Sequence, residues 1–172
     1  CASEYENPTN RRFHAQPVAC LNCGPNYMFI SENVKTENFE EVLELTARYL
    51  TEGKIVAIKG IGGFFIACDA LQEYSVQHLR KIKIREGKPF AIMFRDVETV
   101  TQYCAANQKE IDTLDSWRRP IVILRSKNLL PEGVSNGINT IGALLPYMPF
   151  HYLLFEKLKT AAIVFTSGNL KD

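Results

Sequence analysis

Short apolar segments alternate with helical patterns through most of this 172-residue chain, from residue 38 to its end. The apolar segments typical of strands are residues 54–58, 64–68, 90–94, 121–124, 141–145 and 161–165. The helical patterns cover residues 39–50, 72–85, 97–104, 108–115 and 150–159. The first helix has Asn38 and Gly53 where an N-cap and a C-terminal glycine are expected. Such alternation predicts an α/β fold built on a mixed sheet.

Composition places the chain among ordinary globular proteins. Hydrophobic residues make up 46% of it and charged residues 23%, which is enough for one good core. The formal net charge of +1 gives no overall attraction to nucleic acid or to a membrane, and no apolar run approaches the ~18 residues that a membrane-spanning helix needs. Two of the five cysteines, Cys68 and Cys104, stand alone in apolar contexts, so the chain fits a reducing compartment and we expect it in the cytoplasm.

The other three cysteines, Cys1, Cys20 and Cys23, have a spacing typical of zinc ligands. A structural zinc usually takes four ligands from two Cys-x-x-Cys pairs, so we expect the fourth cysteine upstream of Cys1 and interpret the chain as a piece of a larger protein. Residues 1–30 are polar and rich in turns, and a bound metal would stabilise them. The alternative is a set of isolated thiols. His14 could replace a ligand, but a surface or packing role is more common for a lone histidine.

A glycine-rich loop, Lys59-Gly60-Ile61-Gly62-Gly63, follows the first apolar segment. Glycine lets backbone amides come close to a phosphate, and Lys59 at the end of a strand can add positive charge. The spacing differs from that of a Walker P-loop. A tight turn between two strands is at least as good an interpretation of these residues.

A basic run ends the helix predicted over residues 72–85 and continues to the next strand; it contains Arg80, Lys81, Lys83, Arg85 and Lys88. Such a run usually forms a solvated helix face. However, Lys88 precedes Pro89 at a helix-to-strand junction, where cations can converge on an anion from a rigid frame. Ser167-Gly168-Asn169 is a similar polar turn after the last strand. Proteins of the α/β class bind ligands in crevices at such sheet edges.

Several ordered motifs make the chain similar to one known family over essentially its whole length. The first part resembles the second zinc finger of HypF-type carbamoyltransferases, which mature nickel–iron hydrogenases; it reads CASEYENPTNRRFHAQPVACLNCGP. The segments that resemble the YrdC-like domain of that family, in the same order, are KGIGGFFIACDA, LRKIKIREGKPFAIM, RRPIVIL, IGALLPYMPFHYLLF and TSGNL. The resemblance implies a YrdC-like twisted open mixed sheet with flanking helices over residues 38–172, C-terminally incomplete, whose concave face holds ATP. Residues 1–30 would be a small zinc-finger remnant, the C-terminal part of a C4-type finger.

The resemblance also implies site residues. A Lys-x-Arg and a Ser-x-Asn motif bind nucleotide and substrate in YrdC-like proteins; Lys83 and Arg85 match the first motif here, and Ser167 and Asn169 match the second. We expect both charges of the first motif to face ligand rather than core. The predicted nucleotide- and substrate-binding residues are therefore Lys59, Lys83, Arg85, Lys88, Ser167 and Asn169. Phe65 departs from the pattern, because the family usually has histidine after Gly-Gly-Phe, and any polar contact from that position is lost.

The activity that the resemblance implies is adenylation. Carbamate, made from carbamoyl phosphate by an acylphosphatase domain, would attack the α-phosphate of ATP bound with magnesium and give carbamoyl-AMP and pyrophosphate. Another domain would pass the carbamoyl group to the C-terminal cysteine of a HypE-type maturation protein, towards the cyanide ligands of the nickel–iron site. The sequence holds neither of those domains, so we expect the isolated piece to be inactive in transfer.

Two other functions fit the same residues. YrdC-like domains are associated with double-stranded RNA binding, and the basic helix could follow phosphates across a groove. A threonylcarbamoyl-adenylate synthase of tRNA modification would share the fold, although free-standing proteins of that kind resemble only the later part of this chain. Salt-dependent binding of RNA, compared with binding of ATP, would separate a binding module from an enzyme.

Overall fold

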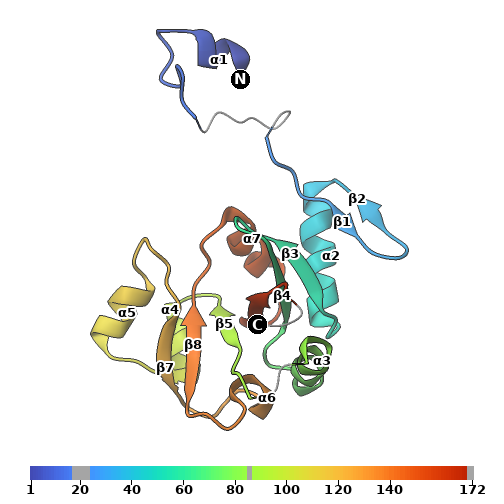
Figure 1. Cartoon of the computed structure of the whole chain (residues 1–172), viewed down its shortest axis with the longest axis vertical. Helices are drawn as coiled ribbons and strands as arrows, with labels where there is room; N and C mark the ends of the chain where they lie inside the picture. Colours follow the sequence, from blue (N-terminus) through green and yellow to red (C-terminus); the bar gives the residue numbers. More distant parts are fainter. Residues whose placement is uncertain (17–23, 85–86, 170–172) are drawn as a thin grey trace. The chain divides into compact units, whose positions relative to one another are not determined.

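The computed structural model describes residues 1–16, 24–84 and 87–169. Backbone contacts divide the chain into two compact units, Cys1–Val42 and Leu43–Asp172, and each is described by itself (Figure 1). The predictions for Cys20, Cys23 and Arg85 lie outside the described residues. No helix in the described ranges is long and apolar enough to cross a membrane.

The first unit contains short elements. Helix α1 (Ala2–Glu6) lies near its start, and strands β1 (Phe29–Ile30) and β2 (Lys35–Thr36) pair as a small antiparallel hairpin. The backbone N–H of Ser31 donates a hydrogen bond to the carbonyl of Val34 at 2.8 Å and closes the turn between them. Buried apolar side chains are scarce among the described residues of this unit, as the polar, turn-rich sequence predicts.

Helix α2 (Phe39–Thr51) begins and ends where the sequence predicts. The Asn38 side-chain oxygen accepts hydrogen bonds from the backbone N–H groups of Glu40 and Glu41 at 3.1 and 3.2 Å. Gly53 follows the last turn with a φ of +79°, a conformation that favours glycine. The predicted N-cap and C-terminal glycine are both confirmed.

A mixed seven-stranded sheet forms the centre of the second unit. Its strands, in spatial order, are β3 (Val56–Lys59), β4 (Phe64–Asp69), β9 (Ala162–Ser167), β5 (Ala91–Phe94), β8 (Thr140–Leu144), β7 (Val122–Ser126) and β6 (Cys104–Ala105). Among these strands, β5 and β8 pair in parallel and every other neighbouring pair is antiparallel. The last strand in sequence, β9, therefore lies inside the sheet, between β4 and β5. The predicted α/β fold with a mixed sheet is confirmed.

Further helices connect these strands: α3 (Glu73–Lys83), α4 (Val97–Tyr103), α5 (Gln108–Leu114), α6 (Glu132–Ser135) and α7 (Pro149–Lys157). Local capping explains where two of them begin. The Asp96 side chain accepts a hydrogen bond from the Thr99 backbone N–H at 2.7 Å at the start of α4. Asn107 and Glu110 form a reciprocal capping box at the start of α5.

Helices α3, α4, α5 and α6 contribute to the core on one face of the sheet. Successive strand side chains point to opposite faces. The buried side chains of this core include Val76, Leu79, Ile92, Phe94, Val100, Leu114, Leu124, Val134, Ala143 and Val164. Helix α7 packs on the opposite face, where His151 contacts Phe165, the strand neighbour of Val164. Lys157 of α7 lies 4.0 Å from Glu44 of α2, so these two helices are neighbours.

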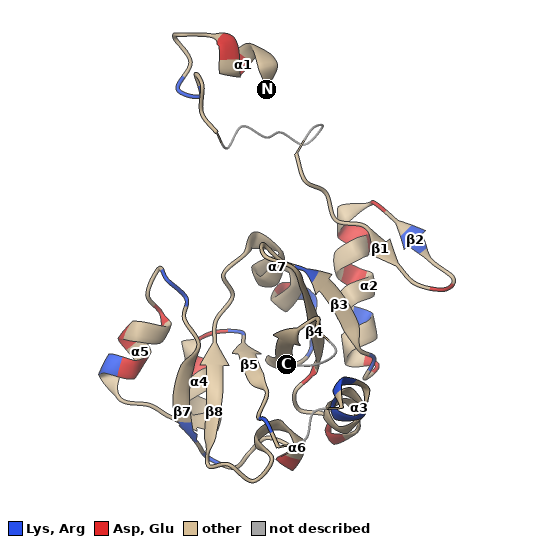
Figure 2. Ribbon diagram, viewed as in Figure 1, with Lys and Arg blue, Asp and Glu red and all other residues tan. Residues whose placement is uncertain are grey.

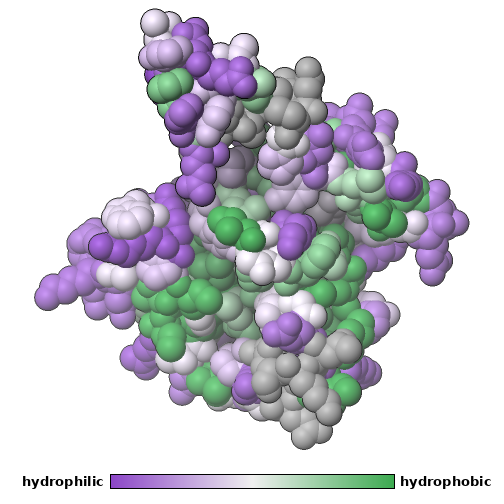
Figure 3. All heavy atoms as spheres, turned by 45° about the horizontal axis from the view of Figure 1, so that its top comes forward, coloured by the Kyte–Doolittle hydropathy of each residue, from purple (hydrophilic) through white to green (hydrophobic). Residues whose placement is uncertain are grey.

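The face that α7 covers is open over β7 and β8. Ile121 and Ile123 expose 58% and 70% of their surface there. Gly142 of β8 lies between Ala91 and Ile123 in the register of the sheet. A Cβ atom added to Gly142 would be 3.1 Å from Ile121 Cγ2 and 3.8 Å from Ala91 Cβ, so these positions share the open face. Figure 3 shows hydrophobic surface on this part of the unit. The expected open sheet is confirmed.

Candidate functional site

Several strand ends meet at one edge of the sheet. Because β4 is antiparallel to both β3 and β9, Lys59 at the end of β3 pairs with Phe64, and Ser167 at the end of β9 pairs with Phe65. Strand β5 is antiparallel to β9 and therefore begins at the same edge, just after the segment that carries Lys88. We define the basic edge as Lys59, Lys83, Lys88, Ser167 and Asn169.

Lys83 ties the end of α3 to the end of β9. Its ammonium group donates hydrogen bonds to the carbonyl oxygens of Ser167 at 2.7 Å and of Asn169 at 2.8 Å. Helix α3 ends at this point because Ile84 adopts a left-handed conformation, with φ of +48°, and its N–H bonds back to the helix carbonyls. The structure thus brings Lys83 together with Ser167 and Asn169, although 84 residues separate Lys83 from Ser167 in the sequence.

The burial of Lys83 differs from expectation. Only 5% of the residue is exposed, whereas its charge was expected to face a ligand rather than the core. The helical period explains the difference: Val76, Leu79, Arg80 and Lys83 recur at the spacing of a single helix face, and all four are buried. The interpretation of the basic run as a solvated face is therefore wrong for Arg80 and Lys83, while Lys81 is exposed. Figure 2 shows the Lys and Arg residues that α3 carries.

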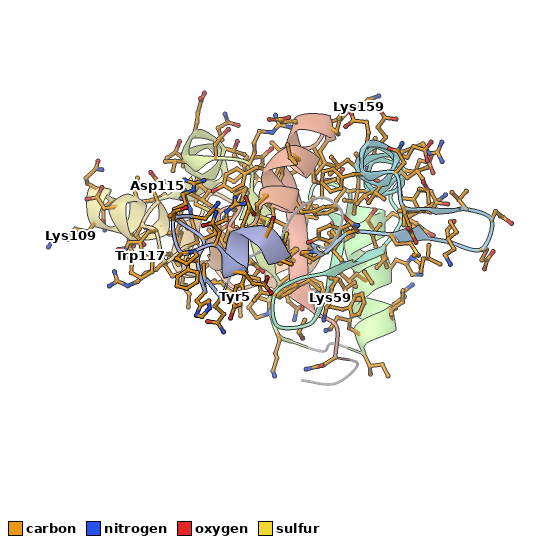
Figure 4. The ribbon with its side chains drawn as sticks, turned by 90° about the horizontal axis from the view of Figure 1, so that it is seen from above. Tyr5, Lys59, Lys109, Asp115, Trp117 and Lys159 are labelled. Carbon is orange, nitrogen blue, oxygen red and sulfur yellow. The ribbon has the colours of Figure 1, made fainter. Side chains whose placement is uncertain are left out.

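The glycine-rich loop is a hairpin turn between β3 and β4. The backbone N–H of Gly60 donates to the Gly63 carbonyl at 2.7 Å, as the tight-turn interpretation predicts. The Phe65 ring lies against Gly60 and occupies the space that a Cβ atom would need there. Figure 4 shows Lys59 at the bend of this hairpin, well apart from Trp117. The Lys59 ammonium lies 5.3 Å from the centre of the Phe64 ring. A role for Lys59 towards phosphate stays a prediction.

Gly168 is required for the turn that follows β9. Its N–H donates a hydrogen bond to the Phe64 carbonyl at 2.7 Å. A Cβ atom on Gly168 would lie 2.8 Å from that same carbonyl oxygen and 3.2 Å from Phe64 Cβ. The close approach of two backbones therefore fixes where Ser167 and Asn169 lie.

We expect Gly168→Ala to destabilise the chain by about 1–3 kcal/mol, because the new methyl group displaces the Phe64 backbone and weakens the hydrogen bond between them. Gly62→Ala is the matched control, since a Cβ atom there would meet no atom within 4 Å. Urea unfolding of both variants measures the difference. Equal stability of the two variants would contradict the proposed packing of this turn.

Arg80 holds the other side of the basic edge. Its guanidinium donates to the carbonyl oxygens of Gly133 through Nε, and of Lys88 at 3.1 Å and Val134 at 3.4 Å through Nη2. It also lies over the Phe90 ring, 4.8 Å from the ring centre. Arg80 belongs to the basic run, but it is not among the predicted binding residues. The spacing of Arg80 relative to the apolar residues of α3 is the signal that could have identified it.

The open face next to the basic edge has a floor of small residues. Gly142 and Ala91 lie side by side in neighbouring strands, and the exposed Ile123 on β7 and Ile121 just before it border them. A flat apolar floor of this kind suits the face of a planar ring. Cations at the adjacent sheet edge suit a negatively charged group on the same ligand.

A pocket of about 210 Å³ lies on the other face, where α6 packs against the ends of β7 and β8. Its lining includes Ser126, Asn128, Glu132, Val134, Ser135, Asn139 and Ile141. None of the described residues that line it is a lysine or arginine, and Glu132 brings negative charge. The pocket is therefore a poorer place for a phosphate than the basic edge is.

The buried histidine and the two buried cysteines of the second unit are unsuited to proton transfer or nucleophilic attack. His151 is buried, with edge-to-face contacts to Tyr147 and Phe165, and burial lowers its pKa to about 4. Burial raises the pKa of Cys68 to about 12 and that of Cys104 to about 11. These thiols stay protonated at neutral pH, so neither is a good nucleophile.

One of the three predicted zinc ligands lies in the described part of the chain. Cys1 is partly exposed, while Cys20 and Cys23 lie outside the described residues. Within the described ranges no three His, Cys, Asp or Glu side chains gather as a metal site. The His14 ring stacks between Tyr5 and Phe13, with ring centres 4.9 and 4.1 Å away, which favours the packing role for this residue. Zinc binding stays a prediction.

Comparisons with known proteins support the sequence resemblance. Residues 48–172 match the Sua5/YciO/YrdC family, described as telomere recombination, and residues 1–30 match the HypF finger. Carbamoyltransferase HypF of Rhodobacter capsulatus is 39% identical over 170 residues, which cover 99% of this chain and 22% of that protein. A crystal structure of full-length HypF in a phosphate- and nucleotide-bound form is 48% identical, with a TM-score of 0.85, over 99% of this chain and 22% of that one.

A more distant structure, Pyrococcus abyssi Sua5 complexed with L-threonine, is 21% identical with a TM-score of 0.68, over 76% of this chain and 39% of that one. At this identity the likeness shows the fold alone. The chain spans 22% of the length of each of these two HypF proteins. The predicted resemblance to HypF-type carbamoyltransferases is confirmed, and through residues 48–172 the chain belongs to the Sua5/YciO/YrdC family.

Proposed function

We propose that this chain is the nucleotide-binding part of a HypF-type carbamoyltransferase. Residues 38–172 form a YrdC-like domain that binds ATP with magnesium, with the phosphates at the basic edge and the base towards the open face. One observation carries this proposal: the Lys83 ammonium is bonded to Ser167 and Asn169, which places two distant motifs at the same strand end. Similarity to a HypF crystallised with phosphate and nucleotide supports it.

The basic edge has the electrostatic character that a triphosphate requires. Lys59, Lys83 and Lys88 bring positive charge to one sheet edge, and the hairpin and the Gly168 turn add backbone groups beside them. Burial of Lys83 reduces the screening of its charge by water, so its attraction for an anion is stronger than that of an exposed lysine. Lys83 also holds the turn in shape, which fixes the Ser167 and Asn169 side chains before ligand binds.

The reaction that we propose for the complete enzyme is adenylation of carbamate. A carbamate oxygen attacks the α-phosphorus of ATP, the bond to the β-phosphate oxygen breaks, and carbamoyl-AMP and pyrophosphate leave the site. Magnesium would supply further charge on the phosphates. The contribution of this chain is to orient the triphosphate and to stabilise the charge that develops on it. The positions of its cations are therefore more important than any nucleophile, which agrees with the protonated thiols described above.

We propose that the remaining steps belong to other parts of the complete enzyme. We propose that carbamate comes from carbamoyl phosphate and that the carbamoyl group goes to the terminal cysteine of a HypE-type partner in the cytoplasm. We also propose that residues 1–30 belong to a C4-type zinc finger in which Cys1, Cys20 and Cys23 bind zinc. The match to the HypF finger supports this last assignment.

Calorimetric titration of the chain with ATP and magnesium tests the proposal. We expect binding of one ATP, weakened about tenfold by Lys59→Ala and by Lys88→Ala, because each removes a charge-assisted contact to phosphate. Lys81→Ala is the matched control, since Lys81 is exposed on α3 outside the basic edge. A duplex RNA of about 20 base pairs serves as the second probe. The proposal fails if ATP does not bind, or if only the RNA binds and the two lysine variants weaken it.

A further inference from the structure

Arg80 reaches three segments that are far apart in the sequence. It lies on α3, and its guanidinium bonds to main-chain carbonyls of Gly133 and Val134 in α6 and of Lys88 just before β5. Only 9% of the residue is exposed. A buried guanidinium is a planar fork of several donors, so it can hold carbonyls in fixed directions, which a lysine ammonium cannot do in the same way.

The surrounding packing makes this junction rigid. A Cβ atom on Gly133 would lie 2.8 Å from Gln77 Nε2 and 2.9 Å from Val76 Cγ1, so α6 approaches α3 as closely as a glycine allows. The Phe90 backbone N–H donates to the Val134 carbonyl at 2.9 Å, which attaches the start of β5 to α6. Arg80 crosses the same junction above the Phe90 ring. Helices α3 and α6 and the start of β5 are therefore fixed, and the hydrogen bond from Arg80 to the Lys88 carbonyl holds the Lys88 backbone beside them.

Two buried cations of α3 thus hold the two sides of the basic edge. Lys83 bonds to the end of β9, and Arg80 bonds to the segment that leads into β5. Strands β9 and β5 are antiparallel neighbours, so the end of one lies beside the start of the other. The distance between Ser167 and Lys88 across the edge depends on both attachments.

We propose that Arg80 is a positioning residue for nucleotide binding, and that it acts by fixing the backbone of Lys88 so that the Lys88 ammonium meets a phosphate of the ligand. The inference rests on the proposed binding of ATP at the basic edge. Arg80 itself is engaged by carbonyl groups and does not touch the ligand. Its effect therefore passes through Lys88.

A double-mutant cycle between Arg80 and Lys88 tests this role. We expect Arg80→Lys, which keeps the charge but loses the fork, to weaken ATP binding about tenfold, as Lys88→Ala does. Combined in one chain, the two changes should weaken binding little more than either alone, because both remove the same contact. The affinity of Arg80→Lys should also depend less on salt than that of the wild type, since one phosphate contact is lost. Lys81→Ala should change neither quantity.

The outcomes separate the two proposals. If the wild type binds ATP and Lys88→Ala weakens this binding, the basic edge binds phosphate. If Arg80→Lys then has the affinity and salt dependence of the wild type, the proposed function stands and the positioning role of Arg80 is overturned. Additive losses in the double variant overturn it as well. Absence of ATP binding by the wild type overturns the proposed function and the role of Arg80 with it. Should Arg80→Lys fail to fold, Phe90→Leu removes the ring beneath the guanidinium and enters the same cycle, with the same expected and contradicting results.

Discussion

Lys83→Ala is expected to lower the free energy of unfolding by about 2–3 kcal/mol and the affinity for ATP by at least about tenfold. The change removes a buried ammonium and leaves the carbonyls of Ser167 and Asn169 without the donor that now holds them. Loss of these two hydrogen bonds favours a different arrangement of the turn, so the end of β9 shifts away from the place where we propose that phosphate binds. Stability and binding therefore fall together.

Urea unfolding and calorimetric titration measure the two effects. Lys83→Met keeps most of the apolar stem without the charge, which separates the lost hydrogen bonds from lost packing. Lys81→Ala removes the same charge from an exposed position of the same helix and should leave both quantities unchanged. The account of this residue is contradicted if Lys83→Met unfolds and binds ATP like the wild type.

Acidification is expected to destabilise the chain through His151. The pKa of this histidine is lowered by burial to about 4, from its ordinary value of 6.5. Between these values the unfolded chain binds a proton that the folded chain does not, so stability is fully present above pH 6.5 and falls as the pH drops towards 4. The difference amounts to a loss of about 3 kcal/mol by pH 4. Neither ring nitrogen has a hydrogen-bond partner within the part of the chain that the structure describes, so no hydrogen bond there offsets this cost.

Urea unfolding at pH 7, 5.5 and 4 measures this dependence. His151→Leu should lose less stability than the wild type over the same range, by about 3 kcal/mol at pH 4. His78→Gln is the matched control, because His78 is exposed on α3 and should leave the wild-type pH profile unchanged. A wild-type chain and a His151→Leu variant with parallel pH profiles would show that this histidine is not buried in its neutral form.

Local sequence signals predict most of the helices and strands from residue 38 onward. The N-cap Asn38, the glycine after α2 and the alternation of strands and helices are properties of neighbouring residues, and the structure confirms them. The shortest helices and strands could not be predicted in this way. Helix α6 has four residues and β6 has two, which is too short to display a period. The place of β9 between β4 and β5 also cannot be read from the sequence, because strand order depends on contacts between residues far apart in the chain.

In the candidate site, too, local features could be predicted from the sequence and long-range contacts could not. Lysine, serine and asparagine residues at predicted strand and helix ends could be named in advance, since those ends are visible in the pattern. The burial of these residues could not be predicted. A basic run on a helix indicates a solvated face unless it is known which segments pack against that helix. Arg80 and Lys83 are buried because carbonyl groups from Lys88, α6 and β9 surround them, and these groups come from segments that the helix sequence does not specify.

A crystal structure of this chain with ATP and magnesium would show directly whether nucleotide binds at the basic edge. We expect phosphate oxygens within hydrogen-bond distance of Lys59 at the end of β3, of Lys88 just before β5 or of Ser167 at the end of β9, with the base over Gly142 and Ala91 on the open face. A nucleotide bound instead in the pocket beside Ser135 and Asn139, with no phosphate contact to the basic edge, would contradict this expectation.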